Sequence, residues 1–495
     1  MNDGGKSDSP VRPAKLPNKA VRAVAEVAEE RGLAEENTAG STRPGPRAGS
    51  AVPSELGRVR EVARRDKEAR FTALLHHVDI PRLRAAFWAI RPKAAPGADG
   101  VRWQDYREDL DANLRDLHGR IHSGAYQAKP SRRAYIPKAD GRQRPLGIAS
   151  LEDKVVQRAV VEVLNAIYEV DFLGFSYGFR PGRSPHDALD ALTTGIKRKR
   201  VNWVLDADIR EFFSNLDHRW LEKFLEHRIA DKRVLRLIDK WLRAGVVEKG
   251  QWSKTDGAPQ GASASPLLAN VYLHYVFDLW VQRWRNRFAE GDVIAVRFAD
   301  DFAMGFEYES DARRFLADLR ERFAKFGLEL HPEKTRLIEF GRHAARHRRR
   351  RGNGKPETFD FLGFTHMCSL TKTGRFWIRR QTISKRMRAK LSEVKEELMR
   401  RRHQPVPEQG RWLRSVVAGH MAYYAVPGNM DTIAGFRTQV TRHWFKALRR
   451  RSQRTRLNWT RMNRLAYKWL PPARVKHPFP DVRFDARIQG RSPVR

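Results

Sequence analysis

Two apolar segments that end in carboxylates constrain the fold of this chain more than any other feature. Residues 203–209 alternate as a strand, with Asp206 and Asp208 on one face. Residues 293–306 hold two short apolar runs on either side of residues 299–301, which predicts a tight hairpin with carboxylates at its tip. Helical patterns lie between and beyond these strands, so the sequence predicts an α+β fold built on a sheet.

Carboxylates in this setting need a partner. An unpaired charge is costly to bury, and if the strands pair, the carboxylates of the two segments converge and repel one another unless a cation lies between them. Hard oxygen ligands suit Mg²⁺, and two ions held by shared carboxylates are a common device for phosphoryl transfer. Two alternatives stay open on these residues. Asp206 is as well placed on its strand as Asp208, and an Asp-Asp pair alone is also typical of a solvated turn.

The charge balance predicts a polyanionic partner. The 495 residues include 96 Lys and Arg against 58 Asp and Glu, a formal net charge of +38, and nucleic acid is the most common partner for such a charge.

The 41% hydrophobic residues suffice for a sizeable core. One cysteine, Cys368, excludes intrachain disulfides and Cys-rich zinc modules. With no signal-like start and no apolar run of about 18 residues, we expect a cytoplasmic protein and no membrane partner.

Composition divides the chain into four parts. Residues 1–53 are rich in Gly, Pro, Ser, Ala and Arg and predict a disordered basic tail. Residues 54–200 predict short helices, beginning with Ser54 as an N-cap, and residues 201–378 predict the sheet. Residues 379–495 predict helices and hold 29 Lys and Arg against 7 Asp and Glu, so well over half of the excess charge lies there.

The basic C-terminal part interleaves arginines with aromatic residues. Residues 384–402 predict a helix with an apolar inner face. Basic side chains neutralise phosphates and aromatic rings stack on unpaired bases, although any one of these rings more often belongs to the core. A second basic run, Arg346 with residues 348–351, suits phosphate binding or a solvated loop equally well. The aromatic residues are Trp412, Tyr423, Tyr424, Trp444, Phe445, Trp459, Tyr467 and Trp469.

Residues 257–266 predict a loop of small residues before a long helix. Ser265 followed by Pro266 is typical of an N-cap and first turn. The apolar stripe at helical spacing over residues 267–280 indicates core packing. Small residues let a ligand approach the backbone, and Gln260 could hydrogen-bond a sugar or a base.

Seven motifs in a fixed order carry a resemblance to a known family. From about residue 80 through the C-terminal part, the chain resembles group II intron-encoded reverse transcriptases, also called intron maturases. The resemblance implies a right-hand polymerase, with fingers in residues 54–200, palm in 201–378, and an α-helical thumb and maturase region in 379–495. The motifs are Tyr135-Ile136-Pro137-Lys138 with Arg144-Pro145-Leu146-Gly147-Ile148; Gly178-Phe179-Arg180-Pro181-Gly182-Arg183-Ser184; Asp208-Ile209-Arg210-Glu211-Phe212-Phe213; Pro259-Gln260-Gly261; Phe298-Ala299-Asp300-Asp301; Gly327-Leu328-Glu329-Leu330-His331-Pro332-Glu333-Lys334-Thr335; and Phe361-Leu362-Gly363-Phe364.

The resemblance implies a catalytic centre for RNA-directed DNA synthesis. Asp208, Asp300 and Asp301 would hold two Mg²⁺ ions, and only the family pattern favours Asp208 over the other carboxylate of its strand. Lys138 and Arg144 would clamp the incoming triphosphate, since arginine offers phosphate a bidentate fork.

Further residues would recognise the substrates. Phe213 would exclude a 2′-hydroxyl by its bulk and so favour dNTPs. Gln260 and Gly261 would contact the nascent base pair and the template, and Lys334 would approach the active site or its phosphates. The implied partners are the intron RNA, an RNA template with a DNA primer, dNTPs, and target DNA reached through a nucleoid-associated ribonucleoprotein. The oligomeric state stays open.

The chain departs from the family pattern at two positions. Phe298 stands where the catalytic block often begins with tyrosine, and Ser214 stands where an aspartate often follows the paired phenylalanines. Neither change removes a catalytic carboxylate, so we expect activity to survive. Many relatives append an endonuclease with paired CxxC motifs, and with one cysteine we expect this chain to lack it. Two alternative functions are a splicing-only RNA-binding maturase and a domesticated reverse transcriptase used in host defence.

Overall fold

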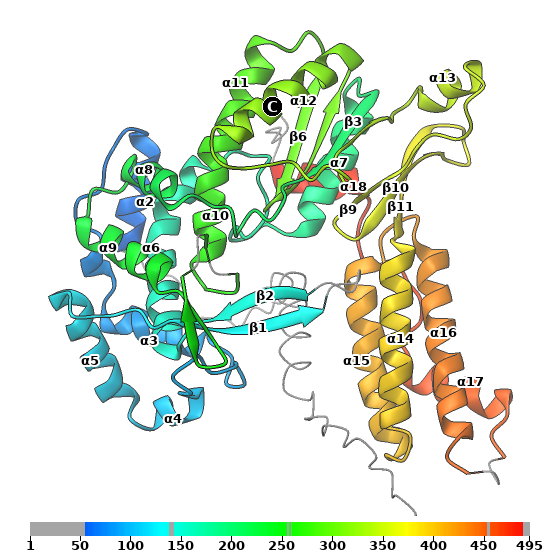
Figure 1. The fold of residues 1–495 in the computed structure, drawn as a ribbon. Helices are drawn as coiled ribbons and strands as arrows, with labels where there is room; N and C mark the ends of the chain where they lie inside the picture. The colour runs from blue at the N-terminus through cyan, green and yellow to red at the C-terminus, as the bar shows by residue number, and fades with distance from the viewer. Residues whose placement is uncertain (1–54, 138–142, 255–256, 259, 453–455, 489–495) are drawn as a thin grey trace, which may run out of the picture.

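Three parts follow one another across the molecule (Figure 1): N-terminal helices with a small sheet, a central sheet between helices, and a C-terminal helical part. The tail predicted for residues 1–53 and its neighbour Ser54 lie outside the described residues. Among the residues that are described, no helix has the length and apolar character needed to cross a bilayer. The structure, a computed structural model, describes residues 55–137, 143–254, 257–258, 260–452 and 456–488.

The N-terminal part packs helices around a small sheet. The sequence predicted short helices here. The structure differs in two ways: α6 is 21 residues long, and the two segments before it in the chain, β1 and β2, pair as antiparallel strands. Two later strands, β4 (Val246–Glu248) and β5 (Gln251–Ser253), complete a sheet with the order β2-β1-β4-β5. The N-terminal elements are α2 (Glu55–Arg65), η2 (Leu75–His77), α3 (Ile80–Trp88), α4 (Trp103–Glu108), α5 (Leu110–Ser123), β1 (Ser131–Pro137), β2 (Gln143–Ile148) and α6 (Leu151–Asp171).

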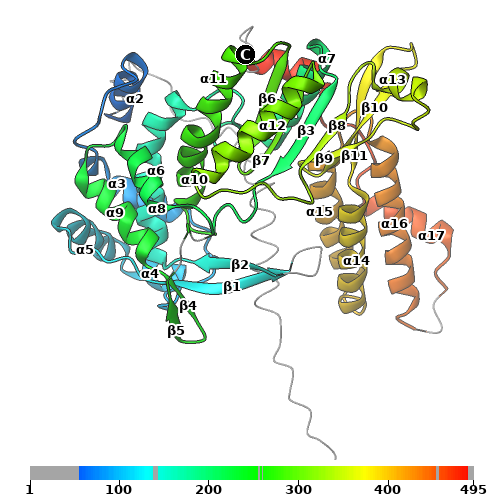
Figure 2. The same ribbon diagram turned by 45° about the horizontal axis from the view of Figure 1, so that its top comes forward.

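The central sheet has the order β6-β7-β3-β8, and each neighbouring pair is antiparallel. Successive side chains of a strand point to opposite faces. Leu205 and Met304 therefore join the core with α10 and α12, while Val204 and Ala303 join the core with α7. Figure 2 shows α11 and α12 on one side of the sheet and α7 on the other. These elements are α7 (Pro185–Arg198), β3 (Trp203–Asp208), α8 (His218–Glu226), α9 (Lys232–Arg243), α10 (Ser265–Leu273), α11 (Leu279–Arg287), β6 (Val293–Phe298), β7 (Asp301–Phe306), α12 (Glu309–Ala324) and β8 (Arg336–Glu339).

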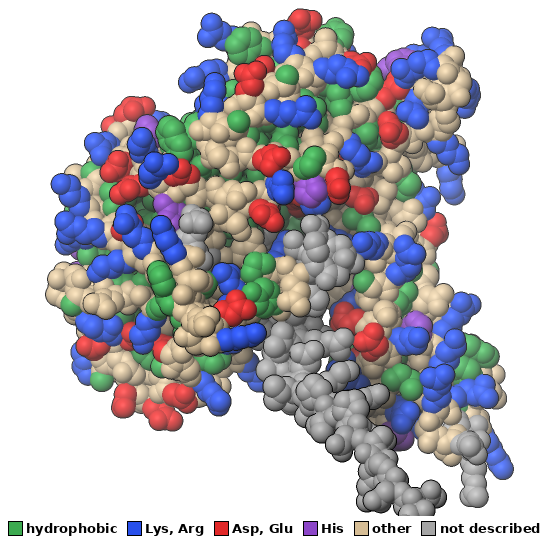
Figure 3. All heavy atoms as spheres, in the orientation of Figure 1, with side chains coloured by type: hydrophobic (Ala, Val, Ile, Leu, Met, Phe, Trp, Pro, Cys, Tyr) green, Lys and Arg blue, Asp and Glu red, His purple; other side chains and the backbone are tan. Residues whose placement is uncertain are grey.

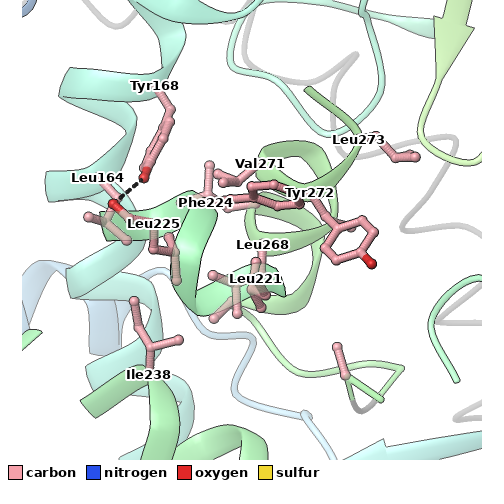
Figure 4. Close-up of a cluster of buried hydrophobic side chains, with 14 of the residues drawn as sticks. Leu164, Tyr168, Leu221, Phe224, Leu225, Ile238, Leu268, Val271, Tyr272 and Leu273 are labelled. Carbon is pink, nitrogen blue, oxygen red and sulfur yellow. Dashed lines mark hydrogen bonds between the residues drawn. The ribbon is translucent and has the colours of Figure 1, made fainter. Parts of the chain in front are cut away.

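A buried apolar cluster joins the first two parts (Figure 4). Leu164 and Tyr168 of α6 lie against Leu225 of α8, with Leu268 of α10 on the other side of α8. The Tyr168 hydroxyl donates a hydrogen bond to the Leu225 carbonyl at 3.4 Å, so its polar end is satisfied although the side chain is buried. Burial of each such leucine contributes about 1.5–3 kcal/mol, which holds the central part against the N-terminal helices.

The long helix expected after the loop of small residues is interrupted. α10 passes through a π-helical turn, His274–Asp278, into α11. A π turn adds a residue and rotates the helix face, and Leu279, predicted to be core, is 40% exposed. The prediction that Ser265 caps the helix is also wrong: Ala264 holds the cap position, and its N–H donates to Gln157 Oε1 of α6 at 3.3 Å.

The C-terminal part is a bundle of basic helices that follows a three-stranded sheet, β11-β10-β9. The predicted helix over 384–402 is confirmed as α14. Trp444 and Tyr423 are buried, so these rings belong to the core, while Trp459 and Tyr467 are exposed. The elements are α13 (Ala344–Arg350), β9 (Phe359–Phe361), β10 (Phe364–Leu370), β11 (Phe376–Thr382), α14 (Ser384–Arg400), α15 (Val406–Tyr424), α16 (Met430–Arg449), α17 (Trp459–Trp469) and α18 (Pro480–Ile488).

The last helix returns to the central part and is tied there by ion pairs. α18 packs on α7, where Asp485 accepts two hydrogen bonds from Arg198 at 2.8 and 2.7 Å. Beneath this contact, Asp190 of α7 is fully buried between Arg380 of β11 and Arg483 of α18, with N–O distances of 2.8 and 2.7 Å. One buried carboxylate therefore connects three elements that are far apart in the sequence.

Candidate active site

Strand register brings the predicted carboxylates together at one end of the central sheet. β6 and β7 form the expected hairpin, with Ala299 and Asp300 as its two turn residues. Asp301, the first residue of β7, lies directly opposite Asp208, the last residue of β3. Opposed residues of an antiparallel pair have their Cβ atoms about 4.5–5.5 Å apart, so the two acidic segments, about 90 residues apart, meet at this end.

Burial and electrostatic repulsion make Asp300 and Asp301 reluctant to ionise. Asp301 keeps an exposed surface at the start of β7. Desolvation of the carboxyl group by the protein around it, followed by the charges of Asp300 and Asp208, raises the pKa of Asp301 to about 8. Burial, followed by the charge of Asp208, also raises the pKa of Asp300. A carboxyl with a pKa of about 8 keeps its proton at neutral pH, so a nearby cation is needed to hold the group ionised.

Three cationic side chains from different parts of the chain face this cluster. Lys334 forms an ion pair with Asp208. The charges of Lys334 and of Arg144, on β2, lower the pKa of Asp300, and Arg386, on α14, does the same to Asp301. The predicted residues Arg144 and Lys334 are thus brought to the carboxylates, and Arg386 is a cation that the sequence analysis missed.

The second carboxylate of β3 has a different environment. Asp206 pairs with Arg336 of β8 at 3.4 Å, the residue directly opposite it in the strand register. Burial raises the pKa of Asp206 to about 6, against the opposing effect of the Arg336 charge. Asp206 therefore has a protein counter-ion, and it lies one strand repeat away from the residue that faces Asp301.

The arrangement of the side chains is not that of a formed metal site. Within the described part of the chain, no three His, Cys, Asp or Glu side chains are grouped closely enough to hold an ion. The contact of Lys334 with Asp208 gives a reason, because an ammonium group stands at a carboxylate oxygen that a metal would use. The donors themselves fit divalent cations, since three carboxylates meet at one end of the sheet. Residues His343 and His347 stack on each other without forming a metal cluster.

A buried arginine supports the turn between β6 and β7. Arg297, on β6, is fully buried, and its five N–H donors all have acceptors. Two bonds, at 2.7 and 2.6 Å, go to Asp278 in the π turn, and one at 2.7 Å goes to Ser176. The remaining two, both 3.0 Å, reach Asn270 and the carbonyl of Ala299. Arg297 thus links α10 and the π turn to the residue just before the paired aspartates.

The turn also needs a glycine beside it. Ala299 has φ = +56°, a left-handed conformation that costs an L-residue about 1–2 kcal/mol. A Cβ on Gly178 would lie 2.2 Å from the Ala299 nitrogen, so only glycine fits there. Asn270 donates to the Gly178 carbonyl at 2.7 Å. The motif that contains Gly178 therefore acts as the support of the Ala299 turn.

The sequence analysis missed this support, although a signal was present. Arg297 interrupts an otherwise apolar run of strand residues, and Asp278 interrupts the apolar stripe of the helix. A buried charge almost always has a partner, so each of the two residues predicts an opposite charge elsewhere. Nothing in the sequence identifies which one.

The loop of small residues connects the central sheet to β2. The Ala258 N–H donates to the Phe213 carbonyl at 2.9 Å, and the Gly147 N–H of β2 donates to the Gln260 carbonyl at 2.7 Å. Phe213 is half-buried, with its ring edge-on to Phe212 at 5.3 Å. The loop thereby places Phe213 and Gln260 on neighbouring backbone segments.

Gln260 carries an unsatisfied polar atom at this point. Its side-chain oxygen Oε1 is buried and has no hydrogen-bond partner among the described residues. Gly261 is exposed and lies beside the Gly147 carbonyl. Lys138 and Pro259, from the predicted substrate-binding set and its motif, lie outside the described residues. An unsatisfied acceptor beside an exposed glycine is suited to a ligand that brings a hydrogen-bond donor.

Comparison with known proteins agrees with the geometry. A family model described as "Reverse transcriptase (RNA-dependent DNA polymerase)" matches residues 136–366. The chain is 35% identical over 274 residues to Protein YkfC of Escherichia coli K12, covering 48% of this chain and 71% of that protein. It is 42% identical over 172 residues to the group II intron-encoded protein LtrA of Lactococcus lactis, covering 34% of this chain and 28% of LtrA. It is also 41% identical over 170 residues to an uncharacterized 91 kDa protein in a cob intron of Schizosaccharomyces pombe, covering 34% and 21%. The last two matches span less than a third of each relative.

Proposed function

Because this chain belongs to the group II intron-encoded reverse transcriptase and maturase family and is an RNA-directed DNA polymerase, we propose that Asp208, Asp300 and Asp301 are its catalytic carboxylates and hold two Mg²⁺ ions. The observation that carries the proposal is the pairing of Asp208 with Asp301 beside Asp300 at one end of the central sheet. The ions, when bound, would lower the pKa of the primer 3′-hydroxyl and neutralise charge on the triphosphate.

The residues around the carboxylates would bind and orient the nucleotide. Arg144, exposed on β2, can offer its fork to the triphosphate. Lys334 would release Asp208 as the cations bind and turn its ammonium group toward the phosphates. Gln260 would accept a hydrogen bond from the base pair or its sugar through the unsatisfied Oε1, with Gly261 leaving room for the template. Lys138, which follows Pro137 in the sequence, would add a second cation.

The same proposal assigns the three parts of the molecule to polymerase functions. The N-terminal part of residues 54–200 would be the fingers, residues 201–378 the palm, and residues 379–495 the thumb and maturase region. In that last region the exposed Trp459 and Tyr467 and the many arginines suit folded intron RNA. We therefore propose that the protein binds its intron RNA, assists splicing, and copies the intron into DNA at a target site.

The direct test is a primer-extension assay. Purified full-length protein, an RNA template with an annealed DNA primer, and the four dNTPs should give cDNA with Mg²⁺, and no cDNA when EDTA removes the metal. A DNA template of the same sequence measures the preference for RNA. Absence of product with the wild-type chain across templates and Mg²⁺ concentrations would contradict the proposal. It would favour the splicing-only maturase instead.

The Phe213 side chain provides a test of substrate choice. We expect Phe213→Ala to raise incorporation of rNTPs relative to dNTPs by about 10- to 100-fold, because loss of the ring makes room for a 2′-hydroxyl. Phe212→Leu is the matched control, since Phe212 is buried in the core behind Phe213. Competition between a dNTP and its rNTP at one template position measures the ratio. An unchanged ratio in Phe213→Ala would show that the ring has only a packing role.

A further inference from the structure

Helix α13 carries a surface that the proposed active site does not use. This short helix lies between β8 and β9, at the outer end of β10 and β11 and away from β1 and β2 in both views (Figures 1 and 2). Cys368 of β10 lies 3.6 Å from the Gly341 carbonyl just before α13, which fixes the helix beside the β10–β11 hairpin. Figure 3 shows Lys and Arg side chains gathered over this end of the molecule.

The arginines of α13 divide into two sets by their partners. On the inner side, Arg348 pairs with Glu357 at 3.3 Å, and Arg351, just after the helix, pairs with Glu339. His347 also contacts Glu339, at 3.3 Å. These contacts use the acidic groups that hold the helix to the sheet, and so they fix which face is turned outward.

The outward face carries three arginines without acidic partners. Arg346, Arg349 and Arg350 are exposed, and none of them forms an ion pair with a residue that the structure describes. They stand at positions i, i+3 and i+4, which place side chains on one face of a helix. Like charges at this spacing repel and destabilise the helix. The arrangement therefore does not stabilise the protein on its own, whereas a polyanion bound to this face would relieve the repulsion between the arginines.

We propose that Arg346, Arg349 and Arg350 form a docking surface for the phosphate backbone of paired RNA. The exposed Lys372 and Arg375 at the turn of the β10–β11 hairpin extend it. A guanidinium fork matches phosphate oxygens, and α13 carries no Phe, Tyr or Trp side chain for stacking on an unpaired base. The surface therefore binds the phosphate backbone and does not distinguish one base sequence from another. It lies away from the carboxylates, so its occupant is a duplex outside the catalytic centre. This inference rests on the proposed function only in taking RNA as the working partner.

The salt dependence of RNA binding tests the surface. The test variant combines Arg346→Gln, Arg349→Gln and Arg350→Gln. The control combines Arg64→Gln, Arg243→Gln and Arg313→Gln, which removes the same charge from exposed arginines that already have acidic partners at helical spacing. Binding of a fully paired RNA hairpin is measured by fluorescence anisotropy over a range of KCl concentrations, and duplex DNA of the same sequence forms a second arm.

We expect the slope of log affinity against log salt on paired RNA to fall by about 2–3 in the test variant, because each neutralised phosphate contributes about 0.9 to that slope. The control should change far less. An equal change in the two variants, or a change on DNA but not on RNA, would overturn the proposal. Both variants should extend a short primer on an RNA template as the wild type does. A wild-type chain that makes no cDNA would therefore refute the polymerase proposal. The docking surface would still be tested by the salt dependence of RNA binding.

Discussion

Asp208→Asn is expected to reduce cDNA synthesis by about 1000-fold or more, whereas Asp206→Asn, on the same face of the same strand, should keep most of the activity. Loss of a metal-holding carboxylate removes several kcal/mol of transition-state stabilisation, and each 1.36 kcal/mol is a factor of ten in rate. Asp206 differs because it lies one repeat away from Asp301, and its partner Arg336 is the residue opposite it on β8. Steady-state primer extension at saturating dNTP measures both variants.

The pair of variants separates catalysis from folding. Each replaces a carboxylate by its near-isosteric amide on β3, so thermal unfolding should be similar in the two. Comparable loss of activity in both variants would show that the face as a whole is required and would remove the reason for choosing Asp208. The Asp208→Asn protein should also still promote splicing of the intron RNA, since that function is proposed to depend on RNA binding and not on the carboxylates.

Arg297→Met is expected to lower the free energy of unfolding by about 3–5 kcal/mol, because Asp278 would be left as an unpaired buried charge. Activity per folded molecule should fall as well. The guanidinium also holds the Ala299 carbonyl, next to the paired aspartates. Chemical denaturation measures the first effect, and primer extension corrected for the folded fraction measures the second.

Two further variants keep these effects apart. In the double variant Arg297→Met with Asp278→Leu, part of the lost stability should return, since an apolar pair often replaces a buried ion pair without loss. The lost activity should not return, because the Ala299 carbonyl still has no donor. Arg380→Met is the matched control: it removes one of the two arginines that flank another buried carboxylate, Asp190, which keeps its contact with Arg483. It should destabilise the protein but leave the activity per folded molecule unchanged. Equal specific activity of the Arg297 and Arg380 variants would refute a positioning role for Arg297.

Local patterns in the sequence predicted the elements that carry the carboxylates. Period-two alternation predicted β3, and the apolar runs around residues 299–301 predicted the β6–β7 hairpin; both are confirmed. These signals are local because the strands are buried on both faces, so each is apolar within its own residues and the aspartates stand out against it. The same reasoning failed at Ser265 and Leu279. At Ser265, the start of α10 is instead bound by Gln157 of α6. At Leu279, a π turn rotates the helix face. Neither cause can be recognised from the local sequence pattern.

The sequence by itself determined which residue types could meet: carboxylates at strand ends, small residues before a helix, and an excess of positive charge concentrated in the C-terminal part. Only the tertiary structure decided the pairings, as when Asp206 takes Arg336 while Asp208 faces Asp301 and Lys334. It also decided that Arg297 supports the turn and that α18 returns to α7. The physical reason is that strand and helix periods depend on neighbouring residues, whereas an ion pair depends on distance in space. A charged residue in an apolar segment predicts that it has a partner of opposite charge, but not where in the chain that partner lies.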